Sequence, residues 1–168
     1  MKRGEMAIRI GQGVDVHAFD AGRRLVLCGV ELPGEKGLAG HSDADVGLHA
    51  VTDAILGAIA RGDLGEHFPD GDPEWRDADS SLFVARALEL AAADGFTVVN
   101  CDLTIVGERP RIAPHRSALR SSLAAVLGVE KSVVSVKATT SEGLGFLGRQ
   151  EGLCAIAVVL MEEAGDDE

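Results

Sequence analysis

Aromatic residues are scarce in this chain. They make up 4% of its 168 residues, with five Phe, one Trp and no Tyr. Hydrophobic residues still reach 46%, so a core has to be built mainly from Ala, Val, Leu and Ile. No run approaches the roughly 18 apolar residues of a membrane-spanning helix, which excludes that class. The length suits one domain with a sizeable core.

Positive charge is also in short supply. The chain has 16 Lys and Arg residues against 27 Asp and Glu residues, a formal net charge of −11 at pH 7. Attraction to nucleic acids or anionic membranes needs a basic surface, so neither is expected as a partner. An anionic substrate would then need local help from cations or helix ends.

The cysteines are few and do not suggest a disulfide framework. Cys28, Cys101 and Cys154 are odd in number, far apart and embedded in apolar segments. This pattern is typical of small buried hydrophobes in a reducing compartment. The N-terminal "MKRGEMA" has no apolar segment of a secretory signal. We therefore expect a cytoplasmic protein.

The pattern of elements predicts one α/β (or α+β) domain over residues 1–168, with a core at about 8–161 and flexible ends at 1–6 and 162–168. The order β-β-α-α-β-α-β predicts mainly β-sheet with helices packed on one face. Hydrophobic periodicity and turn residues place the segments. Strands are expected at 7–17, 24–30, 96–106, 132–138 and 153–161, helices at 42–62, 80–94 and 116–127, and loops at 31–41, 62–79, 107–115 and 139–152.

The stretch "GQGVDVHAF" carries a carboxylate and an imidazole in an apolar setting. Asp15 and His17 alternate with Val14 and Val16, so in a strand both would point to the same face. Alone, the pair fits either a structural hydrogen bond or part of a metal site. A third donor, His49, lies on the following helix, although spacing also allows a partly buried helix histidine. Together the three suit Zn²⁺ with one open position.

The start of that helix predicts two further features. Ser42 reads as its N-cap, with Asp45 completing an S-x-x-D capping box. His41 and Ser42 would then place an anion at the free backbone N–H groups of the helix start. Asp53, one turn past His49, is predicted to accept a hydrogen bond from the imidazole and orient it.

Two glycine-rich stretches near the C-terminus invite different interpretations. "KATTSEG" (137–143) offers hydroxyls for a phosphate and Glu142 for Mg²⁺, or it is an ordinary turn. "GLGFLG" (143–148) matches G-x-G-x-x-G, but it leads into the strand-like "LCAIAVVL" rather than opening a helix. A Rossmann site is therefore excluded. No spacing indicates an activated protein nucleophile.

Taken together, four stretches resemble the 2-C-methyl-D-erythritol 2,4-cyclodiphosphate synthase family. They are "RIGQGVDVHAF", "GHSDADVGLHAVTDAILGAIARGDLGEHFPD", "ADSS" and "VKATTSEGLGFLGRQEG", and the resemblance spans about residues 8–161. It implies a homotrimer of α/β subunits with active sites between subunits. It also implies cyclisation of 4-diphosphocytidyl-2-C-methyl-D-erythritol 2-phosphate with release of CMP, in the non-mevalonate route to isoprenoids. No cytidylyltransferase portion, as in bifunctional members, is visible.

The resemblance also implies roles for individual residues. Zinc, one ion per chain, would be held by Asp15, His17 and His49, and Glu142 would hold Mg²⁺ or Mn²⁺ on the substrate diphosphate. His41 and Thr140 would stabilise the transition state. Arg111 stands where some members carry Lys, and Ser141 where Thr is common, which keeps the charge and the hydroxyl. Substrate contacts are implied at Asp15, His17, His41, Ser42, Asp63, Leu64, Gly65, Phe68, Pro69, Asp70, Gly71, Asp72, Gly107, Glu108, Arg109, Pro110, Arg111, Ile112, Ala113, Thr139, Thr140, Ser141, Glu142, Phe146 and Arg149.

Two other functions use the same residues. A metal-dependent phosphohydrolase would activate water at the Asp-His-His set and release inorganic phosphate. A non-enzymatic trimer would bind an isoprenoid diphosphate in a central cavity near Phe146 and Arg149 without turnover. The products formed from the cytidine substrate distinguish these functions from the cyclisation.

Overall fold

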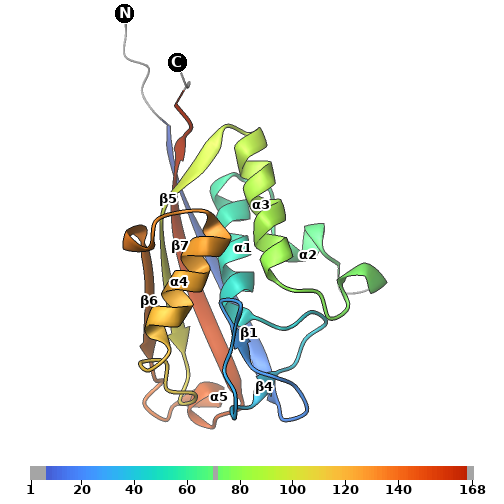
Figure 1. The fold of residues 1–168 in the computed structure, drawn as a ribbon. Helices are drawn as coiled ribbons and strands as arrows, with labels where there is room; N and C mark the ends of the chain where they lie inside the picture. The colour runs from blue at the N-terminus through green and yellow to red at the C-terminus, as the bar shows by residue number, and fades with distance from the viewer. Residues whose placement is uncertain (1–6, 70–71, 166–168) are drawn as a thin grey trace, which may run out of the picture.

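A five-stranded sheet organises the molecule (Figure 1). The computed structural model describes residues 7–69 and 72–165. The strand order is β4-β1-β7-β5-β6, and only β5 and β6 pair in parallel, joined through the helix α4. The other neighbours are antiparallel. The strands are β1 (Ile8–Asp20), β4 (Gly37–Leu38), β5 (Phe96–Val106), β6 (Val134–Thr139) and β7 (Gly152–Glu163).

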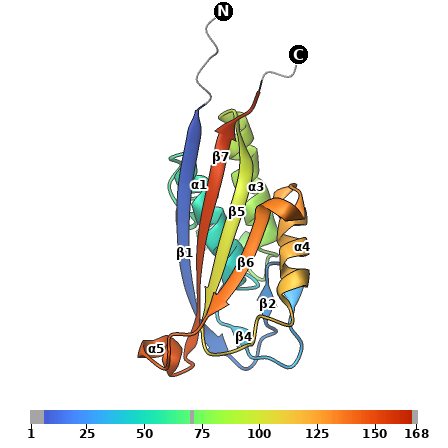
Figure 2. The same ribbon diagram turned by 90° about the vertical axis from the view of Figure 1, so that its left-hand side faces the viewer.

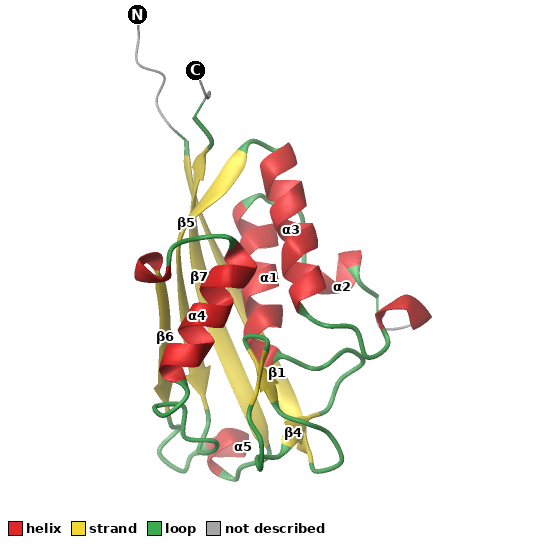
Figure 3. Ribbon diagram, in the orientation of Figure 1, coloured by secondary structure: helices red, strands yellow, loops and turns green. Residues whose placement is uncertain are grey.

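The long helices cover one face of this sheet, as the sequence predicts (Figures 1 and 2). They are α1 (Val46–Ala58), α3 (Ser81–Ala93) and α4 (Arg116–Leu127). Shorter turns of helix lie in the connections (Figure 3): α2 (Leu64–His67), α5 (Gly145–Gly148) and the 3₁₀ turns η1 (Pro73–Trp75) and η2 (Lys131–Val133). Within residues 7–69 and 72–165, no helix is long and apolar enough to cross a membrane.

Two glycines let α1 lie directly against β1. A Cβ atom at Gly11 would stand 1.8 Å from the Ala54 carbonyl oxygen, and one at Gly13 would stand 1.9 Å from the Ala50 carbonyl oxygen. Real Cβ atoms do not approach so closely, so only glycine permits this contact between helix and strand. The close approach brings His49 of α1 beside Asp15 and His17 of β1.

The other face of the sheet carries exposed apolar side chains. Along β1, Gly11, Gly13, Asp15 and His17 face the helices, while the alternate residues face away. Figure 2 shows the sheet with α1 and α3 behind its strands and α4 beside β6. The exposed hydrophobic residues of the face away from the helices, 40–69% accessible, are Ile8, Ile10, Val14 and Val16 of β1 and Val158 of β7.

The predicted strand at 24–30 is wrong in form. The structure has two short strands there, β2 (Val26–Leu27) and β3 (Val30–Glu31), paired with each other. Cys28 and Gly29 have φ angles of 51° and 74°, so the chain turns between them instead of extending. β4 also lies within the predicted loop 31–41. The chain ends on two strands, β6 and β7, close to the predicted 132–138 and 153–161, although the predicted order β-β-α-α-β-α-β ends on only one of them.

The predicted N-cap of α1 is also wrong. The helix begins at Val46, and its N-cap is Asp45, whose carboxylate accepts hydrogen bonds from the N–H groups of Gly47 and Leu48. Ser42 lies earlier, and its hydroxyl accepts from the Ala44 N–H (3.1 Å). The helix ends at Ala58, before the predicted stop at Gly62.

The remaining boundaries differ by smaller amounts. The predicted loop 62–79 contains α2 and η1, and the loop 139–152 contains α5. The segment "GLGFLG" ends in α5, a single helical turn that the sequence did not predict. The chain then enters β7 and not the long helix of a βαβ unit, which agrees with the exclusion of a dinucleotide fingerprint. β7 continues through Glu163, so the first residues of the predicted flexible tail belong to the sheet. The rest of that prediction, at 1–6 and 166–168, lies outside the described residues.

Candidate metal centre and pocket

Asp15, His17 and His49 converge as the sequence predicts. Asp15 Oδ2 lies 2.9 Å from His17 Nε2 and 3.0 Å from His49 Nδ1. The two ring nitrogens are 3.1 Å apart. A tetrahedral zinc ion with ligands at roughly 2.0–2.1 Å would have ligand atoms about 3.3 Å apart. The three donors are therefore arranged, with little adjustment, as one face of such a tetrahedron, and they form a candidate metal site.

Hydrogen bonds and burial shape the charges of this site. Burial alone would raise the pKa of Asp15, but the nearby imidazoles of His17 and His49 outweigh it and hold that pKa well below its usual value. Burial likewise opposes the charged form of His17, yet the Asp15 carboxylate and the Ala39 carbonyl raise its pKa. Without a metal ion, the Asp15 carboxylate therefore favours the protonated form of His17.

The three donors open into a pocket of about 490 Å³. Phe68, Trp75 and Phe83 form one wall, with ring centroids 4.5 Å apart for Phe68 and Phe83 and 5.1 Å apart for Phe68 and Trp75. Trp75 and Phe83 are not among the residues predicted from the sequence, because their approach depends on how the segment before α3 folds. The other lining residues are Gly40, His41, Ser42, Leu64, Gly65 and Pro69.

His41 and Ser42 line the pocket, but not as the start of a helix. The N–H groups of Gly47 and Leu48 are bonded to Asp45, so the helix amides that were predicted to receive an anion are already occupied. His41 is exposed, whereas Ser42 is 4% accessible. The segment is held by Arg23, whose guanidinium donates to the carbonyl oxygens of Gly40 and Ser42.

Asp53 does not orient His49, contrary to the prediction. Its carboxylate accepts a hydrogen bond of 2.7 Å from the Leu64 N–H and so positions the turn that lines the pocket. His49 Nε2 points the other way, toward Ser80 Oγ at 2.9 Å and Ser42 Oγ at 3.1 Å. Helical spacing predicted the nearest carboxylate on the same helix, whereas the partners come from other segments.

The predicted methylerythritol-side segments lie partly at the pocket. Leu64, Gly65, Phe68 and Pro69 line it. The carboxylate of Asp63 caps α2 by accepting from the Glu66 N–H, and that of Asp72 accepts from the Glu74 N–H. Asp70 and Gly71 lie outside the described residues.

The predicted nucleotide segments form a second group. None of residues 107–113 or 139–142, all of which the structure describes, lines the pocket around Asp15. The Glu108 carboxylate accepts from the N–H and hydroxyl of Ser141 and from the Gly143 N–H, at 3.1–3.2 Å, and so ties the two segments together. Thr140 donates to Glu142 over 3.0 Å.

Phe146 and Arg149 lie apart from the metal pocket as well. Phe146 is 42% exposed, and neither residue lines the pocket. The Arg149 guanidinium donates to both carboxylate oxygens of Glu151, at 2.8 and 3.2 Å. Within one chain, then, the predicted site residues are brought together in separate groups rather than around one cavity.

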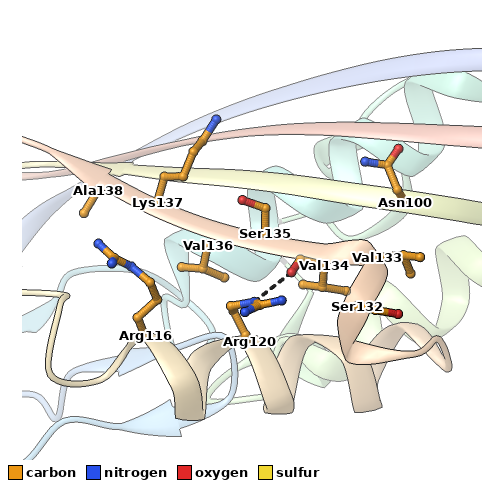
Figure 4. A pocket seen from close by; sticks show the side chains of 10 residues that line it. All are labelled: Asn100, Arg116, Arg120, Ser132, Val133, Val134, Ser135, Val136, Lys137 and Ala138. Atoms are coloured by element: carbon orange, nitrogen blue, oxygen red, sulfur yellow. Dashed lines mark hydrogen bonds between the residues drawn. The ribbon is translucent and has the colours of Figure 1, made fainter.

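A larger hollow of about 950 Å³ runs along β6 and α4 (Figure 4). It contains three cations, but two are engaged. Arg120 donates to the Val134 and Lys131 carbonyl oxygens, and Lys137 forms an ion pair of 2.6 Å with Asp102. None of the predicted site residues lines this hollow.

Several solved and curated proteins are similar to this chain. A 2-C-methyl-D-erythritol 2,4-cyclodiphosphate synthase of Cereibacter sphaeroides is 55% identical over 159 residues, 95% of this chain and 100% of that protein. A solved 2C-methyl-D-erythritol-2,4-cyclodiphosphate synthase in its CDP-bound form superimposes with a TM-score of 0.84 at 40% identity, over 91% of this chain and 99% of that one. The bifunctional IspDF of Campylobacter jejuni gives a TM-score of 0.90 at 38% identity, over 95% of this chain and 43% of that one.

The fold and the site define an α/β enzyme whose candidate metal centre lies between a sheet and its first long helix. A family model described as the YgbB family matches residues 8–162. The chain belongs to this family and has the activity of the 2-C-methyl-D-erythritol 2,4-cyclodiphosphate synthases.

Proposed function

We propose that this chain performs its reaction with Zn²⁺ held by Asp15, His17 and His49. The observation that carries the proposal is the convergence of one carboxylate oxygen and two imidazole nitrogens at the mouth of the pocket. A bound divalent ion would neutralise phosphate oxygens and hold them in place. The three donors have the types and spacing that zinc takes, and the pocket leaves the remaining side open to a substrate oxygen.

The substrate we propose is 4-diphosphocytidyl-2-C-methyl-D-erythritol 2-phosphate. Its 2-phosphate oxygen attacks the β-phosphorus, a new P–O bond forms, the bond from that phosphorus to the CMP oxygen breaks, and CMP leaves. The substrate supplies the nucleophile, which fits a sequence whose spacing indicates no activated protein nucleophile. His41 beside the pocket and the Thr140 hydroxyl would stabilise the charge that develops on the phosphates, and Glu142 would hold Mg²⁺ or Mn²⁺.

The binding roles follow the two groups of residues. The segments Asp63–Gly65 and Phe68–Asp72 would hold the methylerythritol part. The segments Gly107–Ala113 and Thr139–Glu142 would hold the cytidine diphosphate. A solved 2C-methyl-D-erythritol-2,4-cyclodiphosphate synthase and the IspF of Plasmodium falciparum are both complexes with CDP, which supports a cytidine-linked ligand. Because the nucleotide segments do not line the metal pocket of their own chain, we propose that a neighbouring subunit supplies them in a homotrimer.

The reaction is tested by its products. Incubated with the cytidine substrate and divalent ions, the chain should form CMP and a cyclic diphosphate, read by phosphorus NMR. A release of inorganic phosphate would instead indicate a phosphohydrolase. Tight binding of an isoprenoid diphosphate without turnover would indicate a binding protein.

The metal assignment is tested separately. Purified His49→Ala should lose most of its zinc by elemental analysis, while wild type holds about one ion per chain, as three ligands at one centre predict. His67→Ala is the matched histidine control and should keep its zinc. It removes only an exposed hydrogen bond from the imidazole to the Arg61 carbonyl oxygen. Unchanged zinc in His49→Ala would mean that the ligands are assigned wrongly.

A further inference from the structure

A buried hydroxyl lies directly behind the candidate metal ligand His49. Ser80, at the N-cap of α3, is 0% accessible, and its Oγ lies 2.9 Å from His49 Nε2. On its other side the same hydroxyl donates to the Asp43 carboxylate in a short hydrogen bond. The second Asp43 oxygen accepts from the Ser80 backbone N–H at 3.2 Å. Asp43, Ser80 and His49 therefore form one chain of hydrogen bonds that ends at the metal side.

The number of available protons fixes which atom donates in each hydrogen bond among Asp43, Ser80 and His49. A serine hydroxyl has a single proton, and a carboxylate can only accept. Since the Ser80 proton goes to Asp43, Ser80 Oγ can only accept from His49, so the imidazole must carry its proton on Nε2. In the neutral imidazole, Nδ1 is then the nitrogen with a free lone pair. Nδ1 faces Asp15 and His17, and its 3.0 Å contact with the Asp15 carboxylate is then one between two electron-pair donors, which a bound cation would bridge.

Ser42 cannot set this direction alone. Its Oγ lies 3.1 Å from His49 Nε2 and 3.4 Å from Ser80 Oγ, and it accepts from the Ala44 N–H. The Ser42 proton is not committed to a carboxylate, so this hydroxyl can donate to His49 as well as accept from it. Only Ser80 has its proton fixed elsewhere.

His17 provides the comparison within the same site. Its Nδ1 lies 2.5 Å from the Ala39 carbonyl oxygen, which can only accept, so Nε2 is the nitrogen turned to the candidate metal. The two histidines thus reach the same result by different means. A backbone carbonyl orients His17, whereas a side-chain hydroxyl needs its own carboxylate to act as an acceptor toward His49.

We propose that Ser80 and Asp43 are positioning residues for the metal. They hold His49 in the tautomer with Nε2 protonated, and so keep Nδ1 ready to bind a divalent ion. The inference rests on the proposed metal centre and adds to it two residues that touch neither metal nor substrate. In Asp43→Asn, the amide can donate to Ser80 Oγ, which frees the Ser80 proton to donate to His49 Nε2 and favours the tautomer that cannot bind.

Metal affinity is the first test. Zinc dissociation constants, measured by chelator competition on the full chain, should weaken about 10–100-fold in Ser80→Ala and in Asp43→Asn. Ser80→Thr keeps the hydroxyl and should stay near wild type. Ser81→Ala is the matched control, because the Ser81 side chain lies next to Ser80 on the same helix start and belongs to no part of this chain of bonds. Affinities within about threefold of wild type in both Ser80→Ala and Asp43→Asn would overturn the proposal.

Imidazole nitrogen NMR of the metal-free protein at alkaline pH is the second test, and it does not depend on metal binding. Asp15 and His17 face His49 Nδ1 and can accept its proton, so the measured quantity is the change in the fraction of His49 that is protonated on Nε2. This fraction should be lower in Asp43→Asn than in wild type, and an equal fraction in both proteins would overturn the proposal. If wild type binds no zinc but shows the expected difference, the metal centre fails and the hydrogen bonds among Asp43, Ser80 and His49 keep only a structural role.

Discussion

At the scale of single residues, Asp45 joins two parts of the chain with one carboxylate. It accepts from the Gly47 and Leu48 N–H groups at the start of α1 and from the Gly29 N–H over 2.7 Å. Burial raises its pKa from 3.8 to about 6, and the backbone hydrogen bonds offset only part of that rise. Asp45 therefore stabilises the site's helix and the 28–29 turn together, at an electrostatic cost.

The raised pKa of Asp45 makes the stability of the folded protein depend on pH in a defined direction. The folded protein binds the Asp45 proton more tightly than the unfolded chain, so the contribution is full below the unfolded pKa of 3.8 and is lost as pH rises through about 6. Asp45→Asn should destabilise the metal-free protein, by an amount that shrinks with rising pH. The shrinkage can reach up to about 3 kcal/mol between about pH 4 and pH 7.5.

Urea unfolding of wild type and Asp45→Asn at the same protein concentration measures this difference. Contributions of Asp15 and His17 to the pH dependence are common to both proteins and cancel. A gap between the two free energies of unfolding that stays constant across this pH range would show that burial does not raise the Asp45 pKa.

Residue-level prediction from sequence succeeded in bringing Asp15, His17 and His49 together and failed for their surroundings. The alternation of a strand was enough to put Asp15 and His17 on one face, and helix placement supplied His49. Ser42 and Asp45 are both good N-cap residues, so local rules could not choose between them; the contacts of Ser42 with Ala44, His49 and Ser80 decide it. Ser80 and Asp43 were out of reach, because their role needs the packing of α3 beside α1.

At the scale of elements, the contact of α1 with β1 controls the geometry of the candidate centre. Asp15 and His17 belong to the strand, and His49 belongs to the helix. The separation of the two elements sets the separation of the donors, and Gly11 and Gly13 set how closely they approach. A methyl group at the interface would push the elements apart by more than the tolerance of a metal site.

Gly13→Ala should therefore weaken zinc binding as well as stability. Its Cβ would stand 1.9 Å from the Ala50 carbonyl oxygen, a backbone atom that cannot move alone. Overpacking of this kind costs about 1–3 kcal/mol or more. Thermal denaturation and zinc titration measure the two effects.

Gly57→Ala is the matched control for that experiment. It lies on the same helix, and its Cβ would meet only the Gln12 carbonyl oxygen at 3.7 Å. Alanine should stabilise the helix there by about 0.5–1 kcal/mol and leave the zinc affinity unchanged. Equal behaviour of Gly13→Ala and Gly57→Ala would show that the strand glycines do not govern the site.

Element-level prediction was accurate where periodicity is long and poor where chain direction changes. The helices 80–94 and 116–127 and the strand 96–106 were predicted close to their observed positions because apolar spacing runs through several turns or pairs. The residues 24–30 look like one strand by composition. Their turn uses Cys28 at a positive φ, a conformation that its local sequence does not favour and that packing around it has to supply.

At the scale of the whole molecule, two features agree with a shared active site. The face of the sheet away from the helices exposes Ile8, Ile10, Val14, Val16 and Val158. The proposed nucleotide segments, in turn, contribute nothing to the metal pocket of their own chain. Apolar surface of this kind is typical of an interface, and a cyclic trimer would cover it while placing one group of residues beside the other.

Mixing of inactive subunits tests this arrangement. Asp15→Ala and Thr140→Ala, each nearly inactive alone, are unfolded and refolded together in equal amounts. Random mixing should restore activity to roughly a quarter of the sites, because each of the two halves is intact with a probability of about one half. Activity that stays at the level of the single mutants, in material confirmed as mixed trimer, would place both halves on one chain.

The long strand β1 places the candidate metal site far from the end of the sheet where Ile8 lies. Ile8 pairs with Glu162 at one end of the sheet, and His17 pairs with Leu153 toward the other, about 30 Å away along the strand. Additional protein joined beyond Ile8 or Glu163 would thus begin far from the chemistry. This arrangement allows the domain to be fused to another protein without disturbing the site. The bifunctional Campylobacter jejuni relative, of which this chain covers 43%, has the fold within a longer polypeptide. For protein engineering, the same end is the place for a tether to a surface or to another enzyme.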